Sequence, residues 1–281
     1  MTTFPTPLIS VEQLSQRMND DKLVLLDASY FMPAMQRDGR EEWESQRIGQ
    51  AQFFDFDQEI CELGADYPHM MPSPEWFTAC VQKLGVSQQS EVVVYDSLGL
   101  FSSPRAWWMF RAMGHDKVAV LDGGMPAWQS AGLPLNTDAP CSCQVGNFVA
   151  NYRSEMIADA ESVLIALQEP GVCVLDARSE SRFDGSEPEP REGLRSGHMP
   201  GAKNLPFTDV LVDGLMQPAE ALKPLFAALV KPGQRLILSC GSGVTACHLA
   251  LAAEICGYTE LSVYDGSWAE WGARNELPVV V

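Results

Sequence analysis

Basic residues and long hydrophobic runs are scarce in this sequence. Lysine and arginine number 19, against 37 aspartate and glutamate residues, and the formal net charge is −18. A chain this acidic, with no Lys/Arg cluster longer than a pair, would be repelled by a phosphate backbone, so we expect no nucleic-acid partner. A run of roughly eighteen apolar residues, which a membrane helix requires, is absent, so we expect no membrane partner.

Targeting and metal-binding patterns are missing as well. The first residues, Met-Thr-Thr-Phe-Pro-Thr-Pro, contain no basic patch followed by an apolar stretch, so we expect no signal peptide and a cytoplasmic location. The eight cysteines include no CxxC pair and no His/Cys spacing typical of zinc. We therefore expect free thiols, no metal and no cofactor.

The most informative segment is residues 236–246, which read Leu-Ile-Leu-Ser-Cys-Gly-Ser-Gly-Val-Thr-Ala. An apolar run ends in Cys240, two glycines follow, and a helix is predicted from about Thr245. In such a strand, turn and helix N-terminus, backbone N–H groups and the helix dipole stabilise a thiolate, the nucleophilic form of cysteine. A buried packing cysteine is the alternative, but packing alone does not require the two turn glycines.

The chain contains an internal repeat. Each copy reads strand, loop, helix, strand, an Asp-Gly turn, a tryptophan-containing helix and a Leu-Pro exit. The matching segments are 91–135 with 235–279, 23–28 with 172–177, and 48–57 with 198–209. Short apolar runs that alternate with helical stretches indicate βα units on a parallel sheet.

The repeat predicts an α/β fold of two tandem domains, each a mainly parallel sheet flanked by helices. We place the first domain at 1–137, a linker at 138–150 and the second domain at 151–281, because Pro and polar residues gather in the connector. Five tryptophans in helical segments are predicted to anchor the core and the domain interface: Trp107, Trp108, Trp128, Trp268 and Trp271.

The two copies differ at the residue that follows the central strand. Asp96 stands in the first copy where Cys240 stands in the second. Aspartate cannot serve as a sulfur nucleophile, so the chemistry is predicted to lie in the second domain.

Two other cysteine chemistries use a comparable loop. Cysteine-dependent phosphatases need an arginine six residues after the cysteine, and that position is Ala246, which disfavours a phosphatase. Protease-type catalysis needs a histidine base. None of the four histidines lies in a recognisable protease signature, although a spatial pairing stays open.

The repeat, the Cys-Gly-Ser-Gly-Val-Thr-Ala loop and the Tyr-Asp-Gly-Ser-Trp-Ala-Glu-Trp segment resemble the rhodanese superfamily of two-domain sulfurtransferases. Gly241 and Ser242 resemble the branch that uses 3-mercaptopyruvate, because thiosulfate-preferring members commonly carry Arg and Lys there. The resemblance implies that Cys240 attacks the donor sulfur, forms a persulfide and releases pyruvate. The sulfur then passes to a thiol acceptor, such as thioredoxin, or to cyanide.

The resemblance also implies the binding residues. The backbone of Gly241, Gly243, Val244 and Thr245 would hold the anionic persulfide, and Thr245 would cap the following helix or donate its hydroxyl to the sulfur. Arg182 and Arg191 would bind the donor carboxylate, because a guanidinium matches it bidentately. Two further residues are predicted to be structural: Arg178, paired with nearby acids, and His198, which would pin its loop.

A Ser–His–Asp relay that assists the cysteine is proposed for related enzymes. The matching positions are Ser242, His69 and Asp57; the last two fall in the first domain, which would place the relay in a cleft between the domains. The sequence departs from the family pattern at Arg47-Ile-Gly-Gln-Ala, where His-Ile-Pro-Gly-Ala is usual.

Two rival functions remain open at this point. One is a thiosulfate sulfurtransferase of the same fold, which the uncharged loop disfavours. The other is a persulfide carrier or regulatory binding module without turnover, because the first copy shows that the fold persists without its thiol. The intact cysteine loop and arginine pair argue against that second possibility.

Overall fold

The computed structural model describes residue 4 and residues 6–281, which form two compact units. The N-terminal unit comprises the described residues up to Leu63 together with Met71–Arg153, and the C-terminal unit comprises Gly64–Met70 and Ser154–Val281. Within the described part of the chain, no helix is long and apolar enough to span a membrane.

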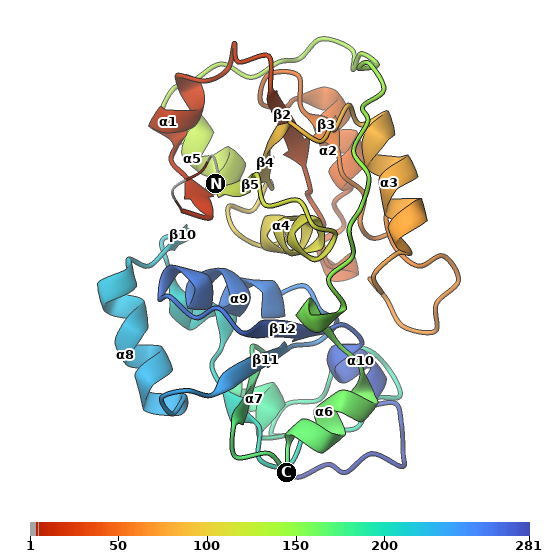
Figure 1. The fold of residues 1–281 in the computed structure, drawn as a ribbon, viewed down its shortest axis with the longest axis vertical. Coiled ribbons are helices and arrows are strands. Elements are labelled where there is room, and N and C mark those ends of the chain that lie inside the picture. The colour runs from red at the N-terminus through yellow and green to blue at the C-terminus, as the bar shows by residue number, and fades with distance from the viewer. Residues whose placement is uncertain (1–3, 5) are drawn as a thin grey trace. The chain divides into compact units, whose positions relative to one another are not determined.

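The N-terminal unit is built on a five-stranded parallel sheet (Figure 1) in the order β1-β5-β4-β2-β3. Its strands are β1 (Leu8–Ile9), β2 (Leu23–Asp27), β3 (Gln52–Phe53), β4 (Glu91–Tyr95) and β5 (Val118–Leu121). Its helices are α1 (Val11–Ser15), α2 (Gly39–Ser45), α3 (Pro74–Lys83), α4 (Ser103–Ala112) and α5 (Gly124–Ser130), with a 3₁₀ turn η1 (Pro33–Met35).

The C-terminal unit has a second five-stranded parallel sheet, in the order β6-β12-β11-β7-β8. Its strands are β6 (Ile157–Ala158), β7 (Val172–Asp176), β8 (Lys203–Asn204), β11 (Arg235–Ser239) and β12 (Leu261–Tyr264), and β9 (Leu211–Val212) pairs with β10 (Leu215–Met216) as a separate antiparallel ribbon. Its helices are α6 (Ala160–Ala166), α7 (Glu180–Phe183), α8 (Ala219–Leu229), α9 (Ala246–Ile255) and α10 (Ser267–Trp271), with 3₁₀ turns η2 (Ser154–Met156) and η3 (Phe207–Val210).

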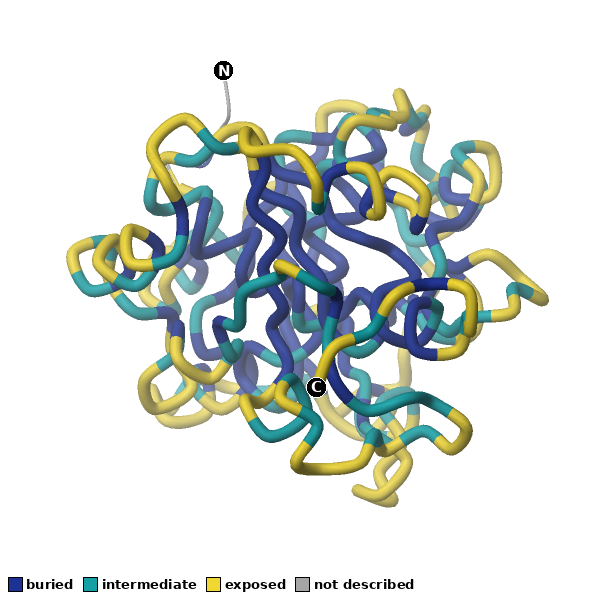
Figure 2. The backbone as a smooth tube through the Cα atoms, turned by 90° about the horizontal axis from the view of Figure 1, so that it is seen from below, coloured by how far each residue is buried: buried dark blue, intermediate teal, exposed yellow. Residues whose placement is uncertain are grey.

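The predicted fold class is confirmed, because the two sheets have the same strand order when β1–β5 are matched to β6, β7, β8, β11 and β12. In both copies the central strand pairs with the matching earlier strand: β4 pairs with β2, and β11 pairs with β7. The apolar runs are buried because helices cover both faces of a parallel sheet. Buried residues accordingly follow the strands and the flanking helices (Figure 2).

The boundaries between the two units differ from the predicted domain boundaries. The segment 138–150, predicted as a linker, packs on the N-terminal unit: Gly146 N donates to Gln82 O at 2.8 Å, and the fully buried Phe148 donates its backbone N–H to Val86 O at 3.2 Å. In addition, Gly64–Met70 groups with the C-terminal unit, although it precedes the linker by about seventy residues. Long-range backbone hydrogen bonds of this kind leave no compositional signal.

The predicted tryptophan core is confirmed, and it explains the Leu-Pro exit of each copy. All five tryptophans are at most 2% exposed. Trp128 Nε1 donates to Pro134 O at 3.0 Å, and its counterpart Trp271 donates to Pro278 O at 2.8 Å. A buried indole N–H needs such a partner, so in each copy the proline carbonyl accepts the hydrogen bond of the tryptophan.

The matching strands β2 and β7 each end in a buried aspartate, but the residue that pairs with the aspartate differs between the two units. Asp176 pairs with Arg178 at 2.7 Å, and both side chains are fully buried. In the N-terminal unit the arginine is replaced by Ser29, which donates its backbone N–H and its hydroxyl to Asp27. Burial of Asp27, with Asp96 nearby, raises the pKa of its carboxyl group from 3.8 to about 7.

Asp27 is therefore expected to make stability fall as pH rises. Its folded-state pKa lies above the unfolded value, so the contribution is complete below pH 3.8 and is lost as pH rises through about 7. At its steepest the loss is about 1.4 kcal/mol per pH unit. Thermal unfolding of Asp27→Asn between pH 4 and 8 should lack this decline. The exposed-site control Asp21→Asn should retain it, and parallel profiles for wild type and Asp27→Asn would contradict the assignment.

Candidate active site

Cys240 lies directly after β11, and the loop 241–245 leads into α9, as the sequence predicts. Cys240 is 1% exposed. Gly243 has φ +73°, a left-handed conformation that favours glycine, so this turn residue has a backbone reason to be glycine. Ala246, the residue six positions after the cysteine, is buried at the start of α9.

Ser267, which the sequence reasoning gave no role, holds this loop in place. Its hydroxyl accepts from the backbone N–H groups of Cys240 and Gly243, each at 3.1 Å, and donates to Tyr264 O at 2.7 Å. Ser267 adopts φ +49°, an unusual conformation for a residue with a side chain. Its counterpart in the N-terminal unit is Gly124, with φ +51°. The C-terminal unit thus has a serine at a glycine-like position, where its hydroxyl ties the cysteine loop.

The backbone confirms that Asp96 and Cys240 are equivalent. Met125 N donates to Asp96 O at 3.0 Å, and Trp268 N donates to Cys240 O at 2.9 Å. The Asp96 carboxylate lies inside its own loop and accepts five hydrogen bonds. Four come from the backbone N–H groups of Leu98, Phe101, Ser102 and Ser103 at 2.9–3.0 Å, and one comes from Ser103 Oγ at 2.6 Å. This strand–loop–helix turn therefore binds an anion.

Four backbone N–H groups of the cysteine loop in the C-terminal unit are not used by the protein. Among the described residues, no acceptor pairs with the backbone N–H groups of Gly241, Ser242, Val244 and Thr245. Since the same turn encloses a carboxylate in the other copy, these amides can stabilise a negative charge carried on Cys240.

The two predicted binding arginines meet at this loop. A Cβ placed on Gly241 would lie 3.2 Å from Arg182 Nη2 and 3.8 Å from Arg191 Nη1, so both guanidinium groups cover the residue after the cysteine. Arg191 Nη2 also donates to Ser242 Oγ at 3.3 Å, and no carboxylate in the described part of the chain pairs with it. An unpaired guanidinium beside a nucleophile is suited to bind an anionic substrate.

Arg178 has the structural role that the sequence predicts. It forms a bidentate pair with Asp176, donates to Gly197 O at 2.9 Å and lies 4.0 Å from the centre of the Trp268 ring. It also donates to Glu189 Oε1 at 2.7 Å, a carboxylate that Arg182 shares. Glu189 stands two residues before Arg191 in the sequence, and no local pattern there indicated a role for it.

His69 and Ser242 come together as the relay hypothesis requires. His69 Nδ1 lies 3.1 Å from Ser242 Oγ and 3.3 Å from Ser242 O, and both side chains are buried. His69 belongs to the segment 64–70, which groups with the C-terminal unit, so this pair forms within one unit. Asp57 lies in the N-terminal unit, and its part in the relay stays a prediction.

Two smaller predictions have different outcomes. His198 pins its loop as predicted: its Nδ1 lies 2.8 Å from Phe183 O and its ring stacks on Phe183. Thr245 occupies the N-cap position of α9, but its side chain makes no capping hydrogen bond. Its φ of −74° and ψ of −14° are already helical, whereas a capping side chain normally requires an extended residue.

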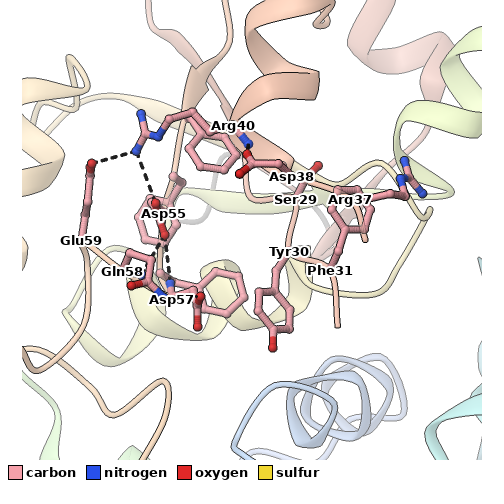
Figure 3. A pocket seen from close by; sticks show the side chains of 14 residues that line it. Ser29, Tyr30, Phe31, Arg37, Asp38, Arg40, Asp55, Asp57, Gln58 and Glu59 are labelled. Carbon is pink, nitrogen blue, oxygen red and sulfur yellow. Dashed lines mark hydrogen bonds and ion pairs between the residues drawn. The ribbon is translucent and has the colours of Figure 1, made fainter. Parts of the chain in front are cut away.

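A cavity of about 400 Å³ in the N-terminal unit lies where β2 and β3 end. Asp57 is one of the residues that line it (Figure 3). Its arginines are neutralised: Arg40 contacts Asp55 at 3.3 Å and Glu59 at 2.8 Å, and Arg37 pairs with Glu42. Arg37 and Arg40 therefore differ from Arg191, which has no carboxylate partner in the described part of the chain.

Among the described residues, no group of three or more His, Cys, Asp or Glu side chains could hold a metal ion.

Comparison with known proteins identifies the class. The model of the rhodanese-like domain family matches twice, at residues 10–131 and 159–274, so the chain belongs to the rhodanese-like family. It is 41% identical to 3-mercaptopyruvate sulfurtransferase of Rattus norvegicus over 98% of this chain and 94% of the relative. It is 38% identical to thiosulfate/3-mercaptopyruvate sulfurtransferase 1, mitochondrial, of Arabidopsis thaliana, over 97% and 78%. The crystal structure of SseA from Escherichia coli, a 3-mercaptopyruvate sulfotransferase, matches with TM-score 0.85 and 34% identity over 94% and 99%.

Proposed function

We propose that this chain is a 3-mercaptopyruvate sulfurtransferase that carries sulfur as a persulfide on Cys240. The observation that supports it most is the site itself: a cysteine in an anion-binding loop, covered by two guanidinium groups. Relatives of that name cover nearly the whole chain.

The first half-reaction follows from this geometry. Arg182 and Arg191 bind the carboxylate and keto oxygen of the donor, which directs its sulfur toward Cys240. The Cys240 thiolate attacks that sulfur, a new S–S bond forms, and the C–S bond breaks with its electron pair on carbon. The resulting enolate of pyruvate takes a proton and leaves, and Cys240 retains the persulfide.

The second half-reaction restores the cysteine. An acceptor thiolate, such as that of thioredoxin, or cyanide attacks the outer sulfur, and the S–S electron pair returns to Cys240. The amides of Gly241, Ser242, Val244 and Thr245 stabilise the sulfur anion in both steps, because they are fixed before the charge arrives.

Mass spectrometry of the intact protein tests the proposal. After exposure to 3-mercaptopyruvate without an acceptor, the protein should gain one sulfur atom on Cys240 and release an equal amount of pyruvate. Addition of cyanide should remove that sulfur as thiocyanate. A protein that gains no sulfur would instead favour the regulatory binding module.

A thiosulfate sulfurtransferase is the nearest alternative. One relative is named for both thiosulfate and 3-mercaptopyruvate, so the kcat/KM values for the two donors have to be compared. The loop offers no cationic side chain between Cys240 and Ala246. We therefore expect a higher kcat/KM for 3-mercaptopyruvate, and a preference for thiosulfate would refute the assignment.

The contact between His69 and Ser242 predicts a role in proton transfer. Ser242→Ala should lower kcat for 3-mercaptopyruvate by roughly ten- to a hundredfold, because positioned proton transfer contributes at least that much. Steady-state kinetics measure the change, and Ser262→Ala, a buried serine on β12, is the matched control. If the two residues form one relay, the double variant Ser242→Ala/His69→Gln should be no slower than the single variant. Unchanged turnover in Ser242→Ala would contradict the relay hypothesis.

A further inference from the structure

Glu189 forms an acidic bridge between the structural arginine and a donor-binding arginine. Its side chain is 2% exposed. Oε1 accepts from Arg178 Nη1 at 2.7 Å and from Arg182 Nε at 3.2 Å, while Oε2 accepts from Arg182 Nη2 at 2.5 Å. Prolines on both sides, Pro188 and Pro190, restrict the backbone that presents it.

The bridge orients Arg182. Arg178 is fixed by Asp176 and Gly197, so it is a rigid support for the Glu189 carboxylate. Two oxygens of that carboxylate then bind two nitrogens of Arg182, which fixes the plane of its guanidinium over Gly241. The Arg182 side chain is still 22% exposed, so it remains partly accessible to a ligand.

The bridge also sets the charge of the site. Asp176 offsets Arg178, and Glu189 offsets Arg182, which leaves Arg191 as the cation without a carboxylate partner in the described part of the chain. The five groups therefore sum to one positive charge. Such a site matches a donor with one carboxylate better than a dianion, whose second charge would meet the Glu189 carboxylate.

We propose that Glu189 is a positioning residue that sets donor selectivity, by fixing Arg182 and by offsetting its positive charge. It favours 3-mercaptopyruvate, which carries one carboxylate, over the dianion thiosulfate. This inference rests on the proposed function, because it concerns the donor of the same reaction.

Donor selectivity measured on one enzyme preparation tests the inference, since any loss of folded protein cancels in the ratio. Glu189→Gln keeps the size and one acceptor oxygen but removes the charge. It should shift the ratio of kcat/KM values toward thiosulfate on the order of tenfold, mainly through the KM for thiosulfate. Glu189→Asp, which keeps the charge, and Glu192→Gln, which removes the same charge from an exposed neighbour, should retain the wild-type ratio. An unchanged ratio in Glu189→Gln would overturn the inference.

A measurement on the wild-type protein covers the case in which Glu189→Gln does not fold. Pyruvate, a monoanion, should protect Cys240 from iodoacetamide at lower concentrations than sulfate, a dianion; the reverse order would overturn the inference. Failure of the proposed function has a different signature, because the wild-type protein would then release no pyruvate from 3-mercaptopyruvate. The protection order would still report the charge preference of the site.

Discussion

Cys240→Ser is expected to abolish sulfur transfer, with kcat/KM for 3-mercaptopyruvate lower by on the order of 10⁴-fold or more. A serine hydroxyl at neutral pH is not ionised and cannot form a persulfide. The loop should be retained, because its anchors are Ser267 and backbone groups that the substitution does not touch. Pyruvate release and the mass of the intact protein measure the effect.

The control for this experiment is another cysteine of the same unit. Cys256 lies at the C-terminal end of α9 and is partly exposed, and Cys256→Ser should keep wild-type turnover. A second variant uses the internal repeat: Cys240→Asp should fold, because the matching loop already encloses the Asp96 carboxylate, yet it should be inactive. Substantial sulfur transfer by Cys240→Ser would exclude Cys240 as the sulfur carrier.

Arg191→Ala is expected to lower kcat/KM for 3-mercaptopyruvate by about a hundredfold. A charge-assisted hydrogen bond to a carboxylate contributes about 1.5–3 kcal/mol, which corresponds to roughly ten- to a hundredfold. We place Arg191 at the upper end, because no described carboxylate neutralises it and it also contacts Ser242. The loss should appear mainly in KM, and steady-state kinetics with 3-mercaptopyruvate as the varied substrate measure it.

An arginine at the surface supplies the control. Arg235 is 45% exposed and lies 3.6 Å from Glu169, so Arg235→Ala removes the same charge with little effect on turnover. The melting temperature of Arg191→Ala should stay near that of the wild type, because the side chain makes a single hydrogen bond within the described protein. A changed melting temperature with an unchanged KM would mean that Arg191 is structural.

The repeat was the part of the sequence that predicted most of the fold. Matched apolar runs and matched Asp-Gly turns indicated two copies of one sheet, and both sheets have the same strand order. The cysteine loop could also be predicted, because the strand, the turn glycines and the helix are contiguous. Local patterns of this kind need no knowledge of distant contacts.

Residues whose roles depend on distant contacts were not predicted. Ser267 reaches Cys240 across 27 positions, because the ends of β11 and β12 meet at one edge of a parallel sheet. Glu189 stands beside a residue that was identified, yet its role depends on Arg178 and Arg182 at once. The contact of His69 with Ser242 spans 173 positions, and it was expected only because the family resemblance implied the relay. The strand order of the repeat, together with the Ser267/Gly124 difference, was the signal from which Ser267 could have been found.

The carboxylate of Asp96 has a consequence for the catalytic cycle. In the N-terminal unit the anion that completes the loop is part of the chain, so that loop is saturated permanently. In the C-terminal unit the corresponding charge is carried by sulfur: by the Cys240 thiolate before the donor reacts, and by the outer sulfur of the persulfide afterwards. The catalytic loop therefore has to accept an anion that moves by one S–S bond during each turnover, which a carboxylate fixed in the chain cannot do.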